Sequence, residues 1–246
     1  MPDISATQII EIPQISVLIL AGGKGTRLKE AVRDRPKVLA PVDGQPWLYY
    51  LLRQLEGAGV RKVVLCTGYM AEKVEEAFGA RLGDLEIQYS VEVQPLGTAG
   101  ALRNALPKCQ HSEILVLNGD SYCEFDLGGL YAFHAGRKAS STIVVTHMNS
   151  AARFGQVIAE HDGRIIRFEE KIAEAGPGWV NAGVYLINRA LLQAIPQGRP
   201  ISLENECFPQ WIGAGFYAFP SDSDKFLDIG IPESFATAKG FVRGLL

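Results

Sequence analysis

The sequence lacks the features that mark several large classes of protein. No apolar run reaches the roughly 18 to 20 residues that a membrane-spanning helix needs, and residues 1–12 contain no basic residue of the kind that begins a secretory signal. The four cysteines are scattered without a C-x-x-C pair, so we expect the reduced thiols of a cytoplasmic protein rather than a disulfide framework or a zinc site. A formal net charge of −3 argues against general binding to nucleic acid.

The order of apolar patterns predicts one α/β domain over residues 1–246, preceded by a tail at 1–13. Strand and helix patterns alternate through 14–140, which predicts a mostly parallel sheet with helices on both faces. Residues 141–246 contain more strand patterns and fewer helical ones, which predicts a more antiparallel half. We expect strands at 15–20, 62–66, 85–90, 113–118, 142–147, 154–159, 163–168, 183–187 and 216–219, and helices at 46–58, 71–78, 98–106, 203–211 and from 232.

The most informative segment follows the first expected strand. The chain runs from Leu20 and Ala21 into Gly22, Gly23 and Gly25, and residues 24–37 contain six basic residues against two acidic ones. Glycines let a backbone approach a ligand and present its N–H groups to anionic oxygens, and basic side chains supply charge for a polyphosphate. The segment predicts a nucleotide site, although a basic turn that needs positive φ is the simpler alternative.

This loop matches neither common phosphate-binding motif. A P-loop needs Gly-Lys followed by Ser or Thr, and the dinucleotide fingerprint needs a third glycine where this chain has Leu28. An oxidoreductase would also need an acidic residue about 20 positions later. Asp43 lies near that distance but within a Pro-Val-Asp-Gly turn, so an oxidoreductase is a remote alternative.

Two carboxylates follow apolar segments far apart in the sequence. Asp120 comes after the strand expected at 113–118, and Asp228 lies within Phe-Leu-Asp-Ile-Gly. Mg²⁺ takes one or two carboxylates together with phosphate oxygens, so both residues are candidate metal ligands. A turn cap at Asp120 and a helix N-cap at Asp228 are the structural alternatives.

Three further segments carry polar or small residues of the kinds that bind sugars and bases. Glu169-Glu170-Lys171 and Asn181-Ala182-Gly183 can hydrogen-bond sugar hydroxyls and hold a phosphate, although the first is also typical of a solvated charge run. Gly97-Thr98-Ala99-Gly100 leaves room for a flat base, or is an ordinary helix start. The four histidines form no triad with Ser, Cys or an acid.

Taken together and in this order, the segments resemble the sugar-1-phosphate nucleotidyltransferases, also called nucleoside-diphosphate-sugar pyrophosphorylases. That family has the pattern L-A-G-G-x-G-T-R-L, then P-K, G-D, E-K, N-A-G and D-x-G, and every part is present between Leu20 and Gly230. The resemblance implies a Rossmann-like α/β fold with a mixed, mostly parallel sheet and helices on both faces. It also implies a nucleotide-binding half at 14–140 and a sugar-phosphate-binding half at 141–246. Longer relatives add a C-terminal β-helix, and we expect none after Leu246.

The resemblance implies roles for individual residues. The catalytic set is Arg27, which stabilises the leaving pyrophosphate, Lys37, which neutralises phosphate charge, and the Mg²⁺ ligands Asp120 and Asp228. The nucleotide-binding set is Leu20, Ala21, Gly22, Gly23, Gly25, Thr26, Gln94, Gly97 and Thr98. The sugar-phosphate set is Glu169, Lys171, Asn181 and Gly183. One departure is Val38 after Lys37, where the family often has proline; the lysine itself is retained.

The implied reaction is in-line attack of a sugar 1-phosphate oxygen on the α-phosphorus of a nucleoside triphosphate. The attacking phosphate is already ionised near neutral pH, so positioning and charge neutralisation suffice and no general base is needed. Within the family the chain is most similar to the D-glycero-α-D-manno-heptose 1-phosphate guanylyltransferases, which implies GTP as donor and a nucleotide sugar for capsule or lipopolysaccharide. A mannose or glucose 1-phosphate enzyme with another base stays an alternative. A catalytically inactive sensor would be expected to have lost Arg27, Lys37, Asp120 or Asp228, and all four are present. A homodimer is expected for so short an enzyme.

Overall fold

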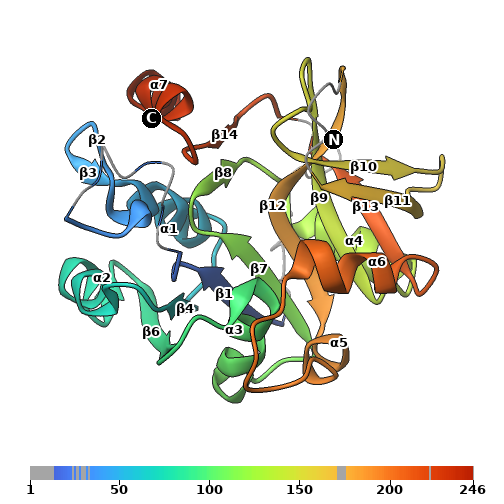
Figure 1. Ribbon diagram of the computed structural model, residues 1–246, viewed down its shortest axis with the longest axis horizontal. Helices are drawn as coiled ribbons and strands as arrows, with labels where there is room; N and C mark the ends of the chain where they lie inside the picture. Colours follow the sequence, from blue (N-terminus) through green and yellow to red (C-terminus); the bar gives the residue numbers. More distant parts are fainter. Residues whose placement is uncertain are drawn as a thin grey trace, which may run out of the picture.

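The protein is described from a computed structural model that covers residues 14–23, 25, 28, 32, 34–170, 176–221 and 223–245. The expected N-terminal tail at 1–13 lies outside these residues. Within them, ten strands form one sheet that joins the two halves of the chain (Figure 1). The central part is parallel, as predicted, and has the order β7-β1-β4-β6. These strands are β1 (Ile15–Leu20), β4 (Lys62–Thr67), β6 (Leu85–Val91) and β7 (Glu113–Asn118), and the short β5 (Arg81–Leu82) pairs antiparallel with β6.

The second half of the chain extends the sheet with antiparallel pairs. The long strand β12 (Gly178–Asn188) lies beside β7 over its last residues, Val184–Asn188, and beside β9 (Ser141–Met148) on its other edge. β13 (Phe216–Pro220) runs parallel to β9. β10 (Gly155–Ala159) and β11 (Ile165–Glu170) form an antiparallel hairpin, close to the strands expected at 154–159 and 163–168.

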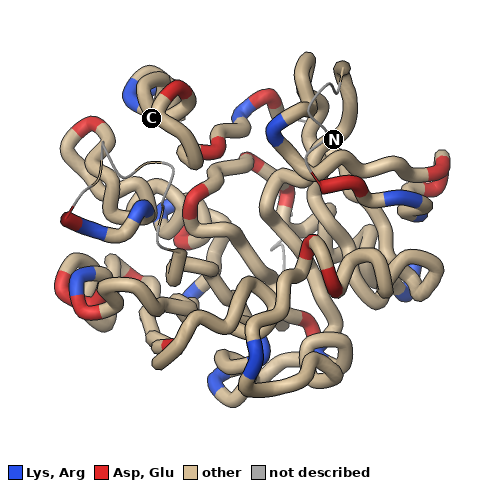
Figure 2. The backbone as a smooth tube through the Cα atoms, in the orientation of Figure 1, with Lys and Arg blue, Asp and Glu red and all other residues tan. Residues whose placement is uncertain are grey.

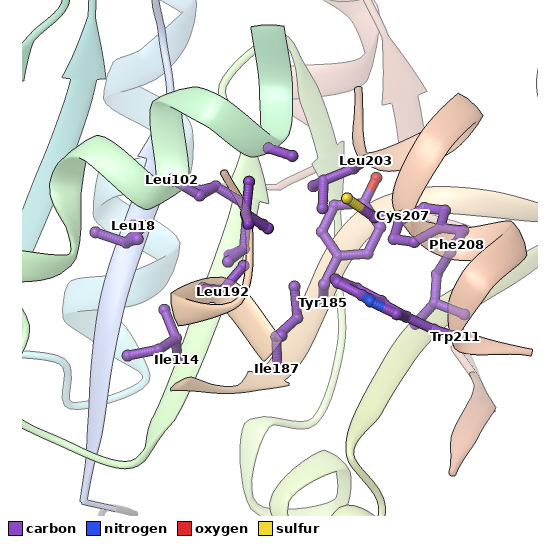
Figure 3. Packing of buried hydrophobic residues seen from close by; sticks show 14 of the residues in the cluster. Leu18, Leu102, Ile114, Tyr185, Ile187, Leu192, Leu203, Cys207, Phe208 and Trp211 are labelled. Atoms are coloured by element: carbon purple, nitrogen blue, oxygen red, sulfur yellow. The ribbon is translucent and has the colours of Figure 1, made fainter. Parts of the chain in front are cut away.

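Helices cover both faces of the sheet, as the sequence predicted. Adjacent residues of β1 enter different cores: Leu18 packs with helices on one face of the sheet, whereas Val17 and Ile19 pack with helices on the other. Figure 3 shows the first of these cores, where Leu102 and Phe208 come from helices and Tyr185 from β12. Burial of strands on two faces explains their continuous apolar runs. The helices are α1 (Trp47–Gly57), α2 (Ala71–Phe78), α3 (Gly97–Ala105), α4 (Leu127–Gly136), α5 (Arg189–Gln193), α6 (Phe208–Trp211) and α7 (Pro232–Arg243).

A third, smaller core attaches the C-terminal helix α7 to α1. Its members include Trp47, Tyr122, Ile229 and Val242, and the ring of Phe241 packs edge-on against Tyr122 at 5.5 Å. Beside it, β8 (Ser121–Cys123) and β14 (Phe226–Asp228) form a two-stranded ladder, and β2 (Pro41–Val42) pairs with β3 (Gln45–Pro46). This core therefore holds β14 next to the segment that follows β7.

Several elements differ from the sequence-based expectation. The helix predicted at 203–211 is a π-helical turn, η4 (Leu203–Cys207), followed by the short α6: the Cys207 N–H donates to the Ser202 carbonyl five residues earlier at 3.3 Å. Helices α4 and α5 and the short strands β2, β3, β5, β8 and β14 were not predicted. Short 3₁₀ turns occupy η2 (Lys37–Leu39) and η3 (Leu106–Lys108). Basic and acidic residues are interspersed over many elements (Figure 2). None of the helices within the described residues is long and apolar enough to cross a membrane.

Candidate functional site

A cleft of about 980 Å³ opens at the carboxyl ends of the parallel strands. Loops after β1, β4 and β6 form one wall, and residues of β12, β14 and the loop after β9 form the other. Ligands of open α/β sheets bind at this edge. The cleft lies where both halves of the chain contribute residues, and the predicted site residues can be placed against it.

Most of the predicted residues line this cleft. They are Leu20, Ala21, Gly22, Gly23, Gly25, Lys37, Gln94, Gly97, Thr98, Asp120, Asn181 and Asp228. Thr26, Arg27 and Lys171 lie outside the described residues, so their predicted roles stay predictions. Glu169 and Gly183 do not line the cleft.

Lys37 and Asp120 form an ion pair inside the cleft. Lys37 begins the η2 turn, and its Nζ donates to Asp120 Oδ2 at 2.6 Å with only 10% of the lysine side chain exposed. Gly25 has a φ of +57°, and a Cβ there would lie 2.9 Å from the Cβ of Lys37. The glycine loop can therefore pass close to the lysine, which places a cation next to the carboxylate at the end of β7.

Asp228 lies opposite Ser121 in the β8–β14 ladder. The Ser121 hydroxyl donates to Asp228 Oδ2 at 3.0 Å, and the Gly230 N–H donates to Asp228 Oδ1 at 2.7 Å. Helix α7 has Ile231 at its N-cap position, so the alternative of Asp228 as a helix N-cap is wrong. Burial raises the pKa of Asp228, the neighbouring Asp120 carboxylate raises it further, and Lys37 lowers it.

The charges of this cluster fit a divalent cation. Two carboxylates, Asp120 and Asp228, lie near Lys37, the one cation that the described residues place beside them. Burial and the charge of Asp120 both raise the pKa of Asp228, and a bound cation would relieve both. No group of three or more His, Cys, Asp or Glu residues gathers as a metal site within the described part of the chain. Two carboxylates are nonetheless the set that Mg²⁺ takes when phosphate oxygens complete its coordination.

The loop that leads into α3 forms the opposite end of the cleft. Gly97 has a φ of +70°, and a Cβ there would lie 2.5 Å from the Ile201 carbonyl oxygen. The Thr98 hydroxyl donates to Glu204 Oε2 at 3.0 Å and accepts from the Leu203 N–H at 2.8 Å. Thr98 therefore fixes this loop against η4, and backbone atoms and Gln94 are the groups it offers to a base.

Asn181 is held at the centre of the second wall. Its Oδ1 accepts from the Gly183 N–H at 2.8 Å, and its Nδ2 donates to the Tyr185 hydroxyl at 2.9 Å. Gly183 has a φ of +76° within the irregular part of β12, and a Cβ there would lie 3.0 Å from the Asn118 side chain. Gly183 thus positions Asn181 from behind without lining the cleft.

Glu170, rather than the predicted Glu169, lines the cleft. Successive side chains of β11 point to opposite sides, and the Glu169 carboxylate pairs with Arg167 Nε at 3.1 Å. Sequence reasoning also missed Glu92, Glu204 and the Phe154–Phe226 ring pair, all of which line the cleft. Phe226 had a sequence signal, since it belongs to the same Phe-Leu-Asp-Ile-Gly segment as Asp228.

Comparison with known proteins assigns the chain to a family. The nucleotidyl transferase family model matches residues 16–243, so the chain belongs to this family. The predicted class, the sugar-1-phosphate nucleotidyltransferases, and the predicted fold are confirmed.

Individual relatives are similar over most of the chain. A D-glycero-α-D-manno-heptose 1-phosphate guanylyltransferase from Aneurinibacillus thermoaerophilus is 36% identical over 226 residues, which cover 92% of this chain and 97% of the relative. A mannose-1-phosphate guanylyltransferase from Mycobacterium tuberculosis is 35% identical over 94% of this chain, which spans 66% of that relative. The crystal structure of HddC from Yersinia pseudotuberculosis complexed with GMP-PN superposes with a TM-score of 0.80 at 31% identity, covering 92% of this chain and 98% of that one.

Proposed function

We propose that this enzyme transfers the guanylyl group of GTP to D-glycero-α-D-manno-heptose 1-phosphate. An oxygen of the sugar phosphate attacks the α-phosphorus, the bond from that phosphorus to the bridging β-phosphate oxygen breaks, and pyrophosphate leaves with the electron pair. The observation that carries the transfer step is the cluster of Lys37, Asp120 and Asp228 in the cleft between the two halves. The choice of heptose and guanine is supported by the similarity to the heptose 1-phosphate guanylyltransferase from Aneurinibacillus thermoaerophilus, of which the match covers 97%.

The residues of the cleft act by binding and charge neutralisation. Lys37, oriented by Asp120, places a positive charge where the phosphates meet. Asn181, fixed by Tyr185, and Glu170 present an amide and a carboxylate to sugar hydroxyls. Arg27 is assigned to the leaving pyrophosphate by its place in the family motif. Such electrostatic groups supply most of the catalysis expected for phosphoryl and nucleotidyl transfer.

Asp120 and Asp228 would hold Mg²⁺. The ion, when bound, would neutralise charge on phosphate oxygens. Support comes from the excess negative charge of the two carboxylates and from the Ser121 and Gly230 contacts that orient Asp228. A cytoplasmic location and a homodimer are further proposals that rest on the sequence.

A mannose-1-phosphate guanylyltransferase is the second candidate. The relative from Mycobacterium tuberculosis is almost as similar, at 35% identity over 94% of this chain. The two sugars share the manno configuration of the ring and differ at the end of the side chain, so the same wall of the cleft can serve either.

A matrix of five nucleoside triphosphates against heptose, mannose and glucose 1-phosphates tests the proposal, with released pyrophosphate as the readout. We expect the highest kcat/KM with GTP and heptose 1-phosphate, and no release after EDTA until Mg²⁺ is restored. Asp120→Asn serves as the inactive control. A higher kcat/KM for mannose 1-phosphate would make the second candidate correct, and a preference for another base would refute guanylyl transfer.

A further inference from the structure

Arg153 is an exposed arginine in the turn that leads into β10, and it lines the cleft. Among the described residues that line the cleft, Lys37 and Arg153 are the basic ones, and Lys37 is already paired with Asp120. Arg153 has no hydrogen bond or ion pair within the described part of the chain, and its guanidinium carbon lies 5.6 Å from the centre of the Phe154 ring. It is therefore a cation at the cleft without an acidic partner.

The residue pairing of β10 places Arg153 in the wall of the cleft that contains Glu170. Gly155, two residues after the arginine, lies opposite Glu170 in the β10–β11 ladder, and a Cβ at Gly155 would lie 2.9 Å from Glu170 Oε2. Because Gly155 has no side chain, Glu170 can lie across the start of β10. The carboxylate proposed for sugar hydroxyls is thus next to the turn that carries Arg153.

Phe154 connects the same turn to the strand of the metal cluster. Its ring packs against the ring of Phe226, with 5.4 Å between their centres. Phe226 and Asp228 are two residues apart in β14, so their side chains lie on the same side of that strand, and both residues line the cleft. Arg153 therefore has the group for sugar hydroxyls on one side and the strand of a proposed Mg²⁺ ligand on the other.

We propose that Arg153 binds the phosphate group of the sugar 1-phosphate and turns its attacking oxygen toward the α-phosphorus. This inference rests on the proposed function and adds a residue that positions the nucleophile. In the proposed reaction the phosphate on C1 lies between the sugar ring and the α-phosphorus, as Arg153 lies between Glu170 and the β14 strand. A guanidinium can hold two oxygens of one phosphate through parallel N–H groups, which leaves the third oxygen free to attack.

The alternative is that Arg153 only covers the Phe154 ring through a cation–π contact. The two roles differ in what methionine and lysine would do at this position. Arg153→Met keeps an apolar stem over the ring but has no charge. Arg153→Lys keeps the charge but replaces the two-pronged guanidinium by a single ammonium group. Phosphate binding therefore predicts a large loss with methionine and a partial recovery with lysine.

The test measures the KM of each substrate while the other is saturating, with released pyrophosphate as the readout. Loss of a hydrogen bond to a charged group corresponds to about a 10- to 100-fold weaker interaction. We expect Arg153→Met to raise the KM for the sugar 1-phosphate by this factor and to leave the KM for GTP unchanged. Arg167→Met is the matched control, because Arg167 is exposed, pairs with Glu169 and does not line the cleft; it should keep both wild-type values.

Two results would overturn the inference. An unchanged KM for both substrates in Arg153→Met, with a lower Tm, would mean that the arginine only covers Phe154. A raised KM for pyrophosphate in the reverse reaction, with an unchanged KM for the sugar 1-phosphate, would assign Arg153 to the leaving group instead.

The proposed function can fail separately from this inference. A preference for mannose 1-phosphate would refute the heptose substrate and leave the inference standing, since both sugars carry the phosphate. A wild-type protein that releases no pyrophosphate from any pair of substrates would refute the proposed function itself. Calorimetric binding of the sugar 1-phosphate then still tests Arg153: a weaker Kd in Arg153→Met supports the inference, and an equal Kd in both proteins overturns it.

Discussion

Replacing Asp228 by asparagine tests separately how the two neighbouring carboxylates affect the stability of the protein and how they affect its activity. An asparagine Oδ1 can still accept from the Gly230 N–H, and its Nδ2 can donate to the Ser121 hydroxyl, so the two contacts of Asp228 are retained in altered form. The substitution removes one negative charge beside Asp120. We expect the variant to be more stable than the wild-type protein and nearly inactive, as is common where stability is given up for function.

The contacts of Ser121 set the size of the stability gain. Its hydroxyl oxygen lies 3.5 Å from Asp120 Oδ1 and 3.0 Å from Asp228 Oδ2, so these carboxylate oxygens are within about 6.5 Å of each other. At an effective dielectric constant near 20, two like charges at that separation repel by about 2 to 3 kcal/mol. Lys37 and the partial exposure of Asp120 reduce the net effect to about 1 kcal/mol, which corresponds to a rise in Tm of about 2 to 4 °C for a chain of this size.

The pH dependence of stability provides a separate check that Asp228→Asn is stabilising. The pKa of Asp228 is raised in the folded protein, so the folded state binds this proton more tightly than the unfolded state does. Wild-type stability from this group therefore rises as the pH falls through the folded-state pKa. The advantage of Asp228→Asn is full above that pKa and disappears below the unfolded-state pKa of the carboxyl.

Thermal melts across pH without added metal, together with pyrophosphate release with Mg²⁺, measure both effects. We expect turnover to fall by about 10²- to 10³-fold, the loss typical of removing one electrostatic group from a transition state. Asp224→Asn, at an exposed position of the same segment that does not line the cleft, should change neither quantity. A lower Tm at neutral pH would refute the electrostatic reasoning, and near wild-type turnover would refute the metal assignment.

Two further predictions concern the sugar wall. Glu170→Gln should raise the KM for the sugar 1-phosphate about 10-fold by weakening a charged hydrogen bond. Glu169→Gln should leave this KM unchanged, because the Glu169 carboxylate pairs with Arg167 away from the cleft. Steady-state kinetics in which Glu169→Gln has the larger effect would contradict the orientation of the strand. Gly183→Ala should lower the free energy of unfolding by about 1 to 3 kcal/mol, the usual cost of a strained φ, because of its φ of +76° and its contact with Asn118; an unchanged urea midpoint would contradict this.

The sequence alone was sufficient to predict the four parallel strands at the centre of the sheet. Its strands are continuous apolar runs because both faces are covered, and the helix at Ala71–Phe78 and the strand at Glu113–Asn118 have the predicted bounds. Helix α4 was missed because Gly128 and Gly129 lie in its first turn and its apolar residues are not confined to one face. Local patterns therefore predicted elements that carry their own periodicity.

The choice between Glu169 and Glu170 could not be made locally. In a strand, a shift of one residue exchanges the two faces, and β11 takes its register from β10, whose pairing is irregular between Ile158 and Ala159. Charge and motif placed both glutamates near the sugar. Only the pairing of the two strands decides which of them lines the cleft.

The proximity of Asp120 and Asp228 depends on two short strands, β8 and β14, that have almost no recognisable sequence pattern. β8 and β14 are three residues each, and their ladder brings Ser121 opposite Asp228. What holds this ladder in place is the third core, in which α7 packs against α1 and the Tyr122 ring. Burying the Asp228 carboxylate costs free energy, as its raised pKa indicates. The apolar packing of the third core offsets this cost and so keeps Asp228 in the cleft. The C-terminal helix thus belongs to the active site in energetic terms, although within the described residues none of its own side chains lines the cleft.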